Sequence, residues 1–223
     1  MRHRLRSPWL LVAVAALAMG AAGTYQFVWS SIRPALATQV GATETSLGTV
    51  FTIYVVAQTL SQFPAGRFRD RHGPRVPMLV GALLLAGGYV GTGLATATTA
   101  VYVAYGAGGA GAGICYTVAV NTPVKWFTER RGLATGVVTL MYSGLSVLFI
   151  PFVREGVATD FTGTLVAVGA VTGLAALLGA IVLRDPERAT DGGEPDADPD
   201  SDPDSERAHG WREAIRTWQF WVL

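Results

Sequence analysis

The sequence predicts an all-α membrane protein, organised as a bundle of six transmembrane helices. Half of its 223 residues are apolar and only 15% are charged, which is too little polar surface for a soluble domain of this length. The charges also cluster between six apolar windows that carry almost none of them. Windows of about twenty apolar residues are typical of membrane-spanning helices.

The six expected spans cover residues 8–29, 47–65, 76–98, 100–124, 133–153 and 161–183. Each is long enough to cross a hydrocarbon core of about 30 Å with some tilt. The first follows a basic N-terminus, as a secretory signal would, but its apolar stretch is longer than a signal core and further spans follow. We therefore expect a retained helix. The third and fourth spans are so close that residues 96–100 must form a tight hairpin.

The distribution of lysine and arginine predicts the orientation of the bundle. Ten of these residues fall on one side, in the N-terminal tail and in the connections between spans 2 and 3 and spans 4 and 5. The opposite connections hold only Arg33 and Arg154. Because positive charge is retained in the cytoplasm, we expect a multi-pass protein of the plasma membrane with a cytoplasmic N-terminus.

The chain changes character after the sixth span. Residues 184–211 are dominated by acidic residues, proline and small residues, which predicts a disordered acidic linker in the cytoplasm. Residues 212–223 combine charges with Trp218, Phe220 and Trp221, as at the interfacial start of a seventh helix. Since a span needs about twenty residues, we expect this helix to be truncated and the chain to be incomplete.

Residues 66–75 read Gly-Arg-Phe-Arg-Asp-Arg-His-Gly-Pro-Arg, a charged loop between the second and third spans. The pattern Gly-x-x-x-Asp-Arg-x-Gly-x-Arg resembles the signature loop of the major facilitator superfamily, at the same place between helices. The resemblance implies a conformational latch made by Gly66, Asp70, Arg71, Gly73 and Arg75.

In such a latch, Asp70 would face the N-terminal end of a helix in the other half of the transporter, where the helix dipole favours a carboxylate. Arg71 and Arg75 would pair with acids or carbonyls on the cytoplasmic side. Gly66 and Gly73 would permit a close approach and a sharp turn.

A second motif connects spans 4 and 5. Its residues Lys125, Trp126, Phe127, Arg130, Arg131 and Gly132 resemble a segment of the oxalate/formate antiporter-like branch and its monocarboxylate-transporter relatives. The resemblance implies the N-terminal half of a major facilitator transporter, with two inverted three-helix repeats. The expected function is secondary transport of a small solute by alternating access. The expected solute is an organic anion such as a mono- or dicarboxylate, moved with a coupling ion or counter-substrate.

Polar side chains within the spans are the candidates for a substrate cavity. No Asp, Glu, Lys or Arg lies in the body of a predicted span, so no proton-relay carboxylate is evident. An amide or phenol in lipid either joins helices or lines a cavity. We expect the cavity to be lined by Tyr25, Gln58, Tyr116 and Tyr142. By the resemblance, charged anion-binding residues belong to a second set of six helices.

Catalytic and metal-binding chemistry find no support in the sequence. Cys115 is the single cysteine, the three histidines fall in predicted loops or tails, and no catalytic set of residues is recognisable. A net charge of +1 gives no indication of nucleic-acid binding. We therefore expect neither an enzyme nor a cofactor.

Three hypotheses stay open. The chain is a transporter half that lacks its C-terminal half, a half-size carrier that acts with a second copy, or a non-transporting sensor or assembly protein. The truncated seventh helix favours the first, and the lack of a folded output domain argues against the third. Besides lipid and solute, the expected partner is thus the missing half or a second copy, and the chain alone should transport nothing.

Overall fold

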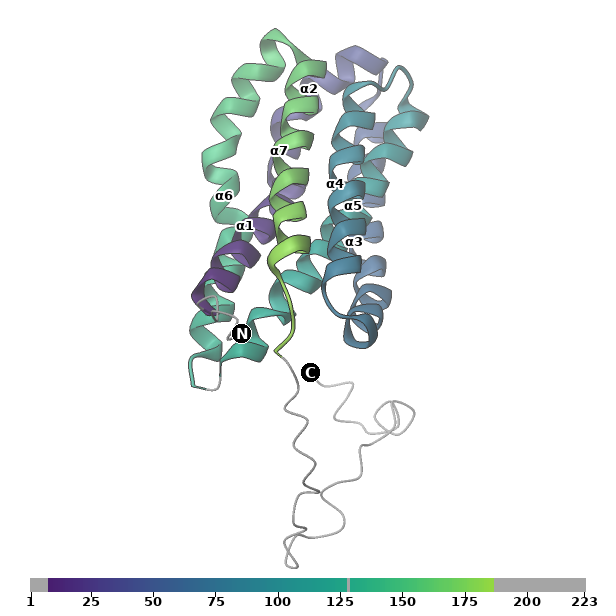
Figure 1. The fold of residues 1–223 in the computed structure, drawn as a ribbon. Coiled ribbons are helices and arrows are strands. Elements are labelled where there is room, and N and C mark those ends of the chain that lie inside the picture. The colour runs from purple at the N-terminus through teal and green to yellow at the C-terminus, as the bar shows by residue number, and fades with distance from the viewer. Residues whose placement is uncertain (1–7, 128, 187–223) are drawn as a thin grey trace, which may run out of the picture. The chain divides into compact units, whose positions relative to one another are not determined.

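The computed structural model describes residues 8–127 and 129–186, and the secondary structure of this part is entirely helical (Figure 1). The elements are α1 (Pro8–Phe27), α2 (Trp29–Val40), α3 (Glu44–His72), α4 (Arg75–Gly93), α5 (Thr98–Asn121), the short 3-10 helix η1 (Pro123–Trp126), α6 (Arg131–Thr159) and α7 (Phe161–Val182). The predicted linker beyond residue 186 and the predicted seventh transmembrane helix lie outside the described residues.

The all-α membrane fold is confirmed. Five of the described helices are long and apolar enough to cross a bilayer, namely α1, α4, α5 with η1, α6 and α7. The predicted second span, α3, is long enough but is not among them. Its exposed side is rich in threonine, and Thr49, Thr52 and Thr59 donate to carbonyls one turn earlier. Together with Gln58 and Gln62, these threonines lower the hydropathy of α3, and each of the three hydroxyls is paired within the helix.

The expectation of a ten-residue loop at residues 66–75 is wrong. Helix α3 continues through this segment to His72, and α4 begins at Arg75. Three basic residues in the last turn of α3 are favourable at a helix C-terminus. Gly73 then ends the helix with a φ of 82°, a conformation that side chains rarely adopt. The turn between the two helices therefore consists of Gly73 and Pro74 alone.

Two other boundaries differ from the expected ones. The first span does not end at residue 29, because helical structure continues through α2 to Val40 after a break at Val28. The fifth runs on to Thr159, six residues beyond its expected end at 153. The hairpin between the third and fourth spans is as short as predicted, since only residues 94–97 separate α4 from α5.

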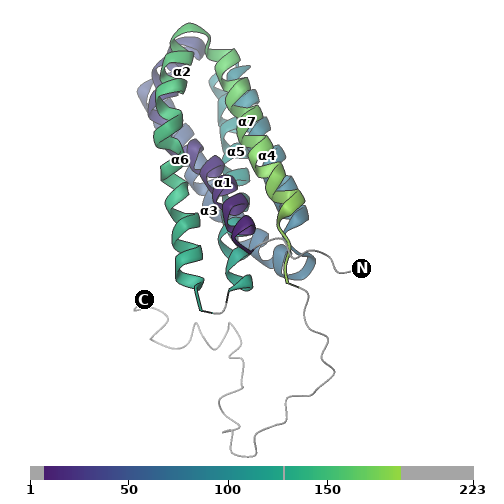
Figure 2. The ribbon, with the colours of Figure 1, turned by 60° about the vertical axis from the view of Figure 1, so that its left-hand side comes forward.

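The helices pack around α1 and α5. Helix α5 contacts both α3 and α4, α4 contacts α7, and α1 runs between α6 and α7 (Figures 1 and 2). Glycines allow the closest approach: a Cβ built on Gly113 would lie 2.2 Å from the backbone oxygen of Gln58. One on Gly109 would lie 2.6 Å from that of Tyr54. Small residues at such positions let helices pack closely in lipid, and here they bring α3 against α5.

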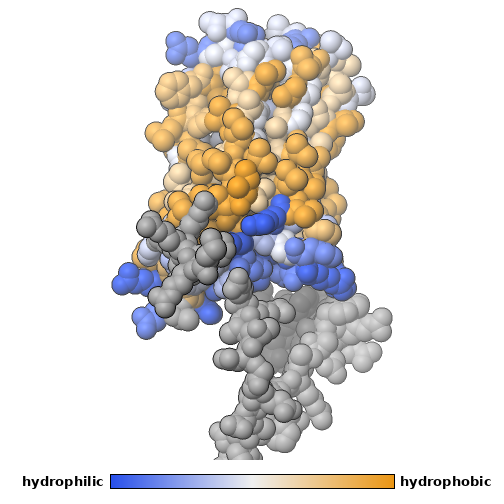
Figure 3. Space-filling model, viewed as in Figure 1, coloured by the Kyte–Doolittle hydropathy of each residue, from blue (hydrophilic) through white to orange (hydrophobic). Residues whose placement is uncertain are grey.

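The surface carries an apolar band between two polar ends (Figure 3). The start of α1, the α3–α4 turn, η1 and the end of α7 all lie at the same end of the bundle (Figures 1 and 2). This end carries the arginines of α3 and α4 and the first residue of α6, Arg131, and we call it the basic end. The segments at this end are the same ones that the distribution of lysine and arginine predicts to lie on one side of the membrane.

Candidate functional site

Three helices meet in a hydrogen-bonded polar cluster, which we call the central cluster. At the midpoint of α3, Gln58 donates from Nε2 to the hydroxyl of Tyr142 on α6, at 2.8 Å. That hydroxyl donates in turn to Oε1 of Gln26 on α1, also at 2.8 Å. Gln58 is buried, whereas Gln26 and Tyr142 are half-buried. The cluster therefore joins α1, α3 and α6 and still presents polar groups at a partly open surface.

A fourth helix contributes an aromatic wall to the central cluster. The ring of Tyr116, from α5, stands perpendicular to that of Tyr142 with their centroids 5.5 Å apart. Phe27 meets the same ring edge-on at 5.8 Å. Edge-to-face pairs at such distances are favourable and hold the ring of Tyr142 in place. Three of the four residues expected to line the cavity, Gln58, Tyr116 and Tyr142, thus lie together.

The fourth, Tyr25, lies in the packed core. Its side chain is fully buried against the rings of Tyr54, Tyr89 and Tyr105. Its hydroxyl fits into space left by two glycines, since a Cβ on Gly88 or Gly108 would come within 2.3 or 2.1 Å of it. It donates to the backbone oxygen of Leu85 at 3.4 Å. Tyr25 is thus a packing residue between α1, α4 and α5.

Two buried hydroxyls near the cluster have no hydrogen-bond partner among the described residues. They belong to Tyr54, one turn before Gln58 on α3, and to Ser146, one turn after Tyr142 on α6. An unsatisfied buried hydroxyl costs about 1–3 kcal/mol, so each is a natural donor for a bound molecule or water. Sequence reasoning missed both residues, although each stands four positions from a predicted cavity residue.

A second polar cluster, the Arg69 cluster, closes the basic end. The side chain of Arg69 is only 1% exposed and pairs with Asp70 at 3.0 Å and with Asp185 at 2.8 Å. It also donates to the backbone oxygen of Asn121 and to the hydroxyl of Thr122, at the end of α5. Lys125 reaches the other oxygen of Asp185 at 3.4 Å. A single buried guanidinium therefore ties together α3, α5 and the segment after α7.

The role of the predicted latch residues stays a prediction, because its contacts would be made with a second half. Among the described residues, Arg71 and Arg75 are exposed and form no ion pair, whereas Arg69 is buried and pairs with two aspartates. Asp70 is 67% exposed beside Arg69. Gly73 makes the sharp turn, but Gly66 makes no close approach, since a built Cβ would meet only Thr117, at 3.6 Å.

The second motif forms the connection between α5 and α6. The indole nitrogen of Trp126 donates to the backbone oxygen of Arg184 at 2.8 Å, and the ring of Phe127 meets Trp9 of α1 at 5.1 Å. Arg131, the first residue of α6, donates to the backbone oxygen of Phe127. Arg130 and Gly132 are exposed. This motif thus packs the connection between α5 and α6 against the start of α1 and against the segment that follows α7.

The described residues contain no group of three or more histidine, cysteine or acidic side chains that could hold a metal ion. The arrangement is instead one of uncharged donors and acceptors in the central cluster and of ion pairs at the basic end. Such a cluster can bind and orient a small polar molecule by hydrogen bonds.

These features define an all-helical membrane protein. Residues 9–223 match the Major Facilitator Superfamily, and the chain belongs to that family. It is 33% identical to an oxalate:formate antiporter of Oxalobacter formigenes over 98% of this chain and 51% of that protein. It is 32% identical to an uncharacterized 38 kDa protein of Thermoproteus tenax, over 89% and 48% of the two chains. An uncharacterized MFS-type transporter of Escherichia coli, YhjX, is 24% identical over 98% and 53%.

The predicted resemblance to the oxalate/formate antiporter branch is therefore confirmed. The chain spans about half the length of the curated relatives it matches.

Proposed function

We propose that this chain forms the first of two helical bundles of a secondary carrier that exchanges small carboxylates by alternating access. The basic end would face the cytoplasm of a cell whose plasma membrane holds the carrier, as the positive-inside rule indicates. A relative named as an oxalate:formate antiporter supports the choice of carboxylates. The second bundle would come from a C-terminal half or from a second copy.

The observation that carries the proposal is the central cluster. It gathers two amides and a phenol hydroxyl from α1, α3 and α6, with the ring of Tyr116 beside them. The buried hydroxyls of Tyr54 and Ser146 add donors without acceptors among the described residues. A carboxylate is an acceptor-only group, so a site rich in N–H and O–H donors suits it.

The counter-charge for such an anion would come from the second bundle. Among the described residues, the one buried charge is Arg69, and it is engaged by two aspartates at the basic end. A carboxylate in a membrane needs a partner of opposite charge or many hydrogen bonds. The site is therefore complete only when both bundles are present.

The latch proposal follows the same logic. Asp70 presents an exposed carboxylate at the end of α3, held by the guanidinium of Arg69. We propose that this carboxylate contacts a helix N-terminus of the second bundle in one of the two carrier states, where the helix dipole favours it. Arg69 would then position Asp70, and Arg71 and Arg75 would remain free for other contacts.

Counterflow in liposomes tests the proposal. The native product is purified from source membranes, its mass is measured, and it is reconstituted with internal oxalate. Uptake of labelled oxalate and formate is then followed. We expect saturable exchange by the native product and none by a 223-residue chain if the native product is longer. A native mass near 23.5 kDa would instead assign the second bundle to a second copy.

Matched variants connect the exchange to the central cluster. Tyr142→Phe and Gln58→Ala should each raise KM or abolish exchange. Tyr102→Phe on α5 is the control, because Tyr102 is a half-buried tyrosine outside the cluster. Exchange that is unchanged in Tyr142→Phe and Gln58→Ala would contradict this site, and a native product that exchanges no carboxylate would contradict the substrate class.

A further inference from the structure

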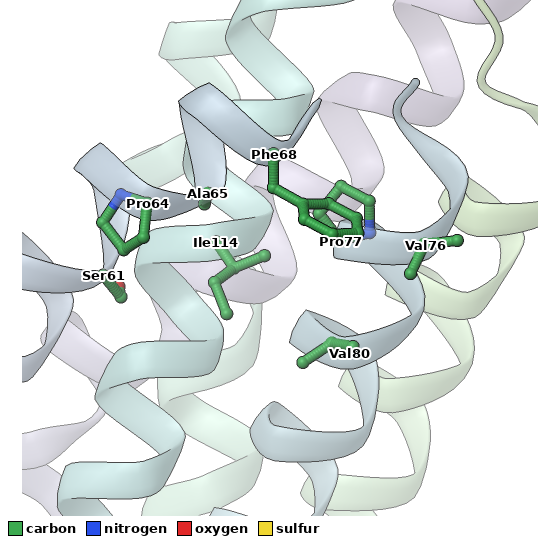
Figure 4. Close-up of a pocket in the computed structure, with 8 residues that line it drawn as sticks. All are labelled: Ser61, Pro64, Ala65, Phe68, Val76, Pro77, Val80 and Ile114. Atoms are coloured by element: carbon green, nitrogen blue, oxygen red, sulfur yellow. The ribbon is translucent and has the colours of Figure 1, made fainter. Parts of the chain in front are cut away.

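A surface groove lies between α3 and α4 near the basic end. Eight residues line it, and Figure 4 shows them converging from three helices: Ser61, Pro64, Ala65, Phe68, Val76, Pro77, Val80 and Ile114. Its volume is about 310 Å³. It exists because α3 and α4 each pack along α5 but touch each other little. The packing of the bundle therefore leaves a cleft between two neighbouring helices.

The groove presents almost no polar group to an occupant. Seven of its residues are apolar, and the eighth, Ser61, has its hydroxyl 3.0 Å from the backbone oxygens of Gln58 and of Ala110. The hydroxyl is thus occupied within the protein. From Ser61 to Phe68 the groove extends along α3 by about 10 Å. This shape suits a hydrocarbon chain lying along the helix.

Basic residues lie within one helical turn of the residues that line the groove. Arg71 and His72 follow Phe68 by three and four residues, so they lie on the same side of α3 as the groove. The ring of His72 stacks on that of Phe68, with centroids 4.4 Å apart. Arg75 directly precedes Val76, which lines the groove from α4. Both arginines are exposed and form no ion pair with another described residue.

We propose that this groove binds one anionic phospholipid, with an acyl chain between α3 and α4 and the phosphate on Arg71 and Arg75. The charges beside the groove select the occupant: guanidinium groups bind phosphate through paired hydrogen bonds. A lipid tail gains little by moving from bilayer to groove, since both are apolar. The groove therefore positions the lipid, and the two arginines supply its preference for an anionic headgroup.

Native mass spectrometry of the chain in detergent tests the proposal without any transport assay. The probes are phosphatidylglycerol and phosphatidylcholine of the same acyl chains, titrated separately. We expect tighter retention of phosphatidylglycerol. Since each basic residue near an anionic headgroup contributes about 1 kcal/mol, Arg71→Gln and Arg75→Gln should each lower that preference about fivefold.

Arg67→Gln is the matched charge control. Arg67 belongs to the same helix but lines a different depression, with Gln62, Phe63, Gly66 and Asp70. Its loss should change the preference by less than about twofold, because a screened charge away from the site contributes little. An equal loss in all three variants would show diffuse attraction to the basic end and overturn the proposal.

Val80→Trp tests the groove itself. Val80 is 44% exposed and lines the groove, so a large ring there should fill it without disturbing the core and should reduce phosphatidylglycerol retention. The control is Val103→Trp. Val103 lies on α5, is 75% exposed and is outside the groove, so its replacement should leave phosphatidylglycerol retention unchanged. Unchanged retention in Val80→Trp, equal binding of the two lipids by the unaltered chain, or a groove covered by a second copy would each overturn the proposal. Far-UV circular dichroism confirms that each variant keeps its helical content.

Discussion

Helices α5 and α6 look alike in sequence but occupy opposite environments. Both are long and apolar, and both carry glycines four residues apart, Gly109 and Gly113 in α5 and Gly132 and Gly136 in α6. Yet 56% of the apolar window of α5 is buried, against 17% for α6. A Cβ on either α5 glycine would clash with α3, whereas one on either α6 glycine would meet nothing within 4 Å.

The difference shows that a pair of glycines indicates close packing only where a second helix lies against it. In α6 the exposed face instead carries large apolar side chains, Leu140, Val147, Leu148 and Phe152. A face of this kind is covered by lipid or by another protein surface. We expect it to belong to the boundary with the proposed second bundle.

The largest effect is expected where α5 meets α3. In Gly113→Val the new side chain would be forced into the backbone oxygen of Gln58, which cannot move aside as a flexible side chain could. We expect the free energy of unfolding in detergent to fall by about 3 kcal/mol. The control is Gly136→Val in α6, which should be neutral. If the two variants lost similar amounts of unfolding free energy, the glycines of α5 and α6 would not differ in their packing.

The C-terminal end of α5 is stabilised by Arg69, whereas the first residues of α6 are exposed. Asp185→Asn removes one of the two carboxylates that neutralise this buried guanidinium. Because breaking a buried ion pair is costly but Asp70 remains, we expect a loss of about 2 kcal/mol of unfolding free energy. Glu155→Gln, an exposed acid of α6, should change it by less than about 0.5 kcal/mol. A neutral Asp185→Asn would show that this pair does not stabilise the bundle.

The hydroxyl of Tyr142 is the polar contact between α6 and α3. Tyr142→Phe removes the bonds to Gln58 and Gln26 and should lower the free energy of unfolding by about 1 kcal/mol, as for hydrogen bonds between helices in membranes. Tyr102→Phe serves again as the control, and urea- or detergent-induced unfolding followed by circular dichroism reports both. If the unfolding transition of Tyr142→Phe were unaltered, these hydrogen bonds would contribute almost nothing to the free energy of unfolding.

The smallest effect is expected on the exposed face of α6. Leu140 is 69% exposed, so Leu140→Ser should change the stability of the chain by less than about 0.5 kcal/mol. Val138, on the same helix, is fully buried, and Val138→Ser should cost about 2 kcal/mol. Equal costs at the two positions would mean that the exposed face of α6 is covered within this chain.

The candidate site was only partly predictable. Gln58, Tyr116 and Tyr142 stand out in the sequence as polar residues within apolar spans, and they do lie together. Gln26 has the same signature but is not among the predicted cavity residues, whereas Tyr25 is among them and packs in the core. A polar residue in a span is visible from the sequence, but which side of the helix it occupies relative to its neighbours is not.

The Arg69 cluster could not be predicted from the sequence. In the sequence Arg69 is one of four arginines in a short charged segment, with nothing to separate it from Arg67, Arg71 or Arg75. Its burial depends on α3 continuing as a helix, which rotates this one side chain toward the end of α5. Its partner Asp185 is 116 positions away in the chain.

The sequence by itself determined the membrane fold, the approximate place of most of the helices, the basic end and the family. Hydropathy, charge and motif spacing are properties of single segments, so they can be recognised in the sequence without knowing which residues are in contact. Only the tertiary structure decided which glycines pack, which arginine is buried, which polar side chains meet and where a groove opens between α3 and α4. These depend on the rotation and separation of helices around α5, which result from packing among residues far apart in the chain.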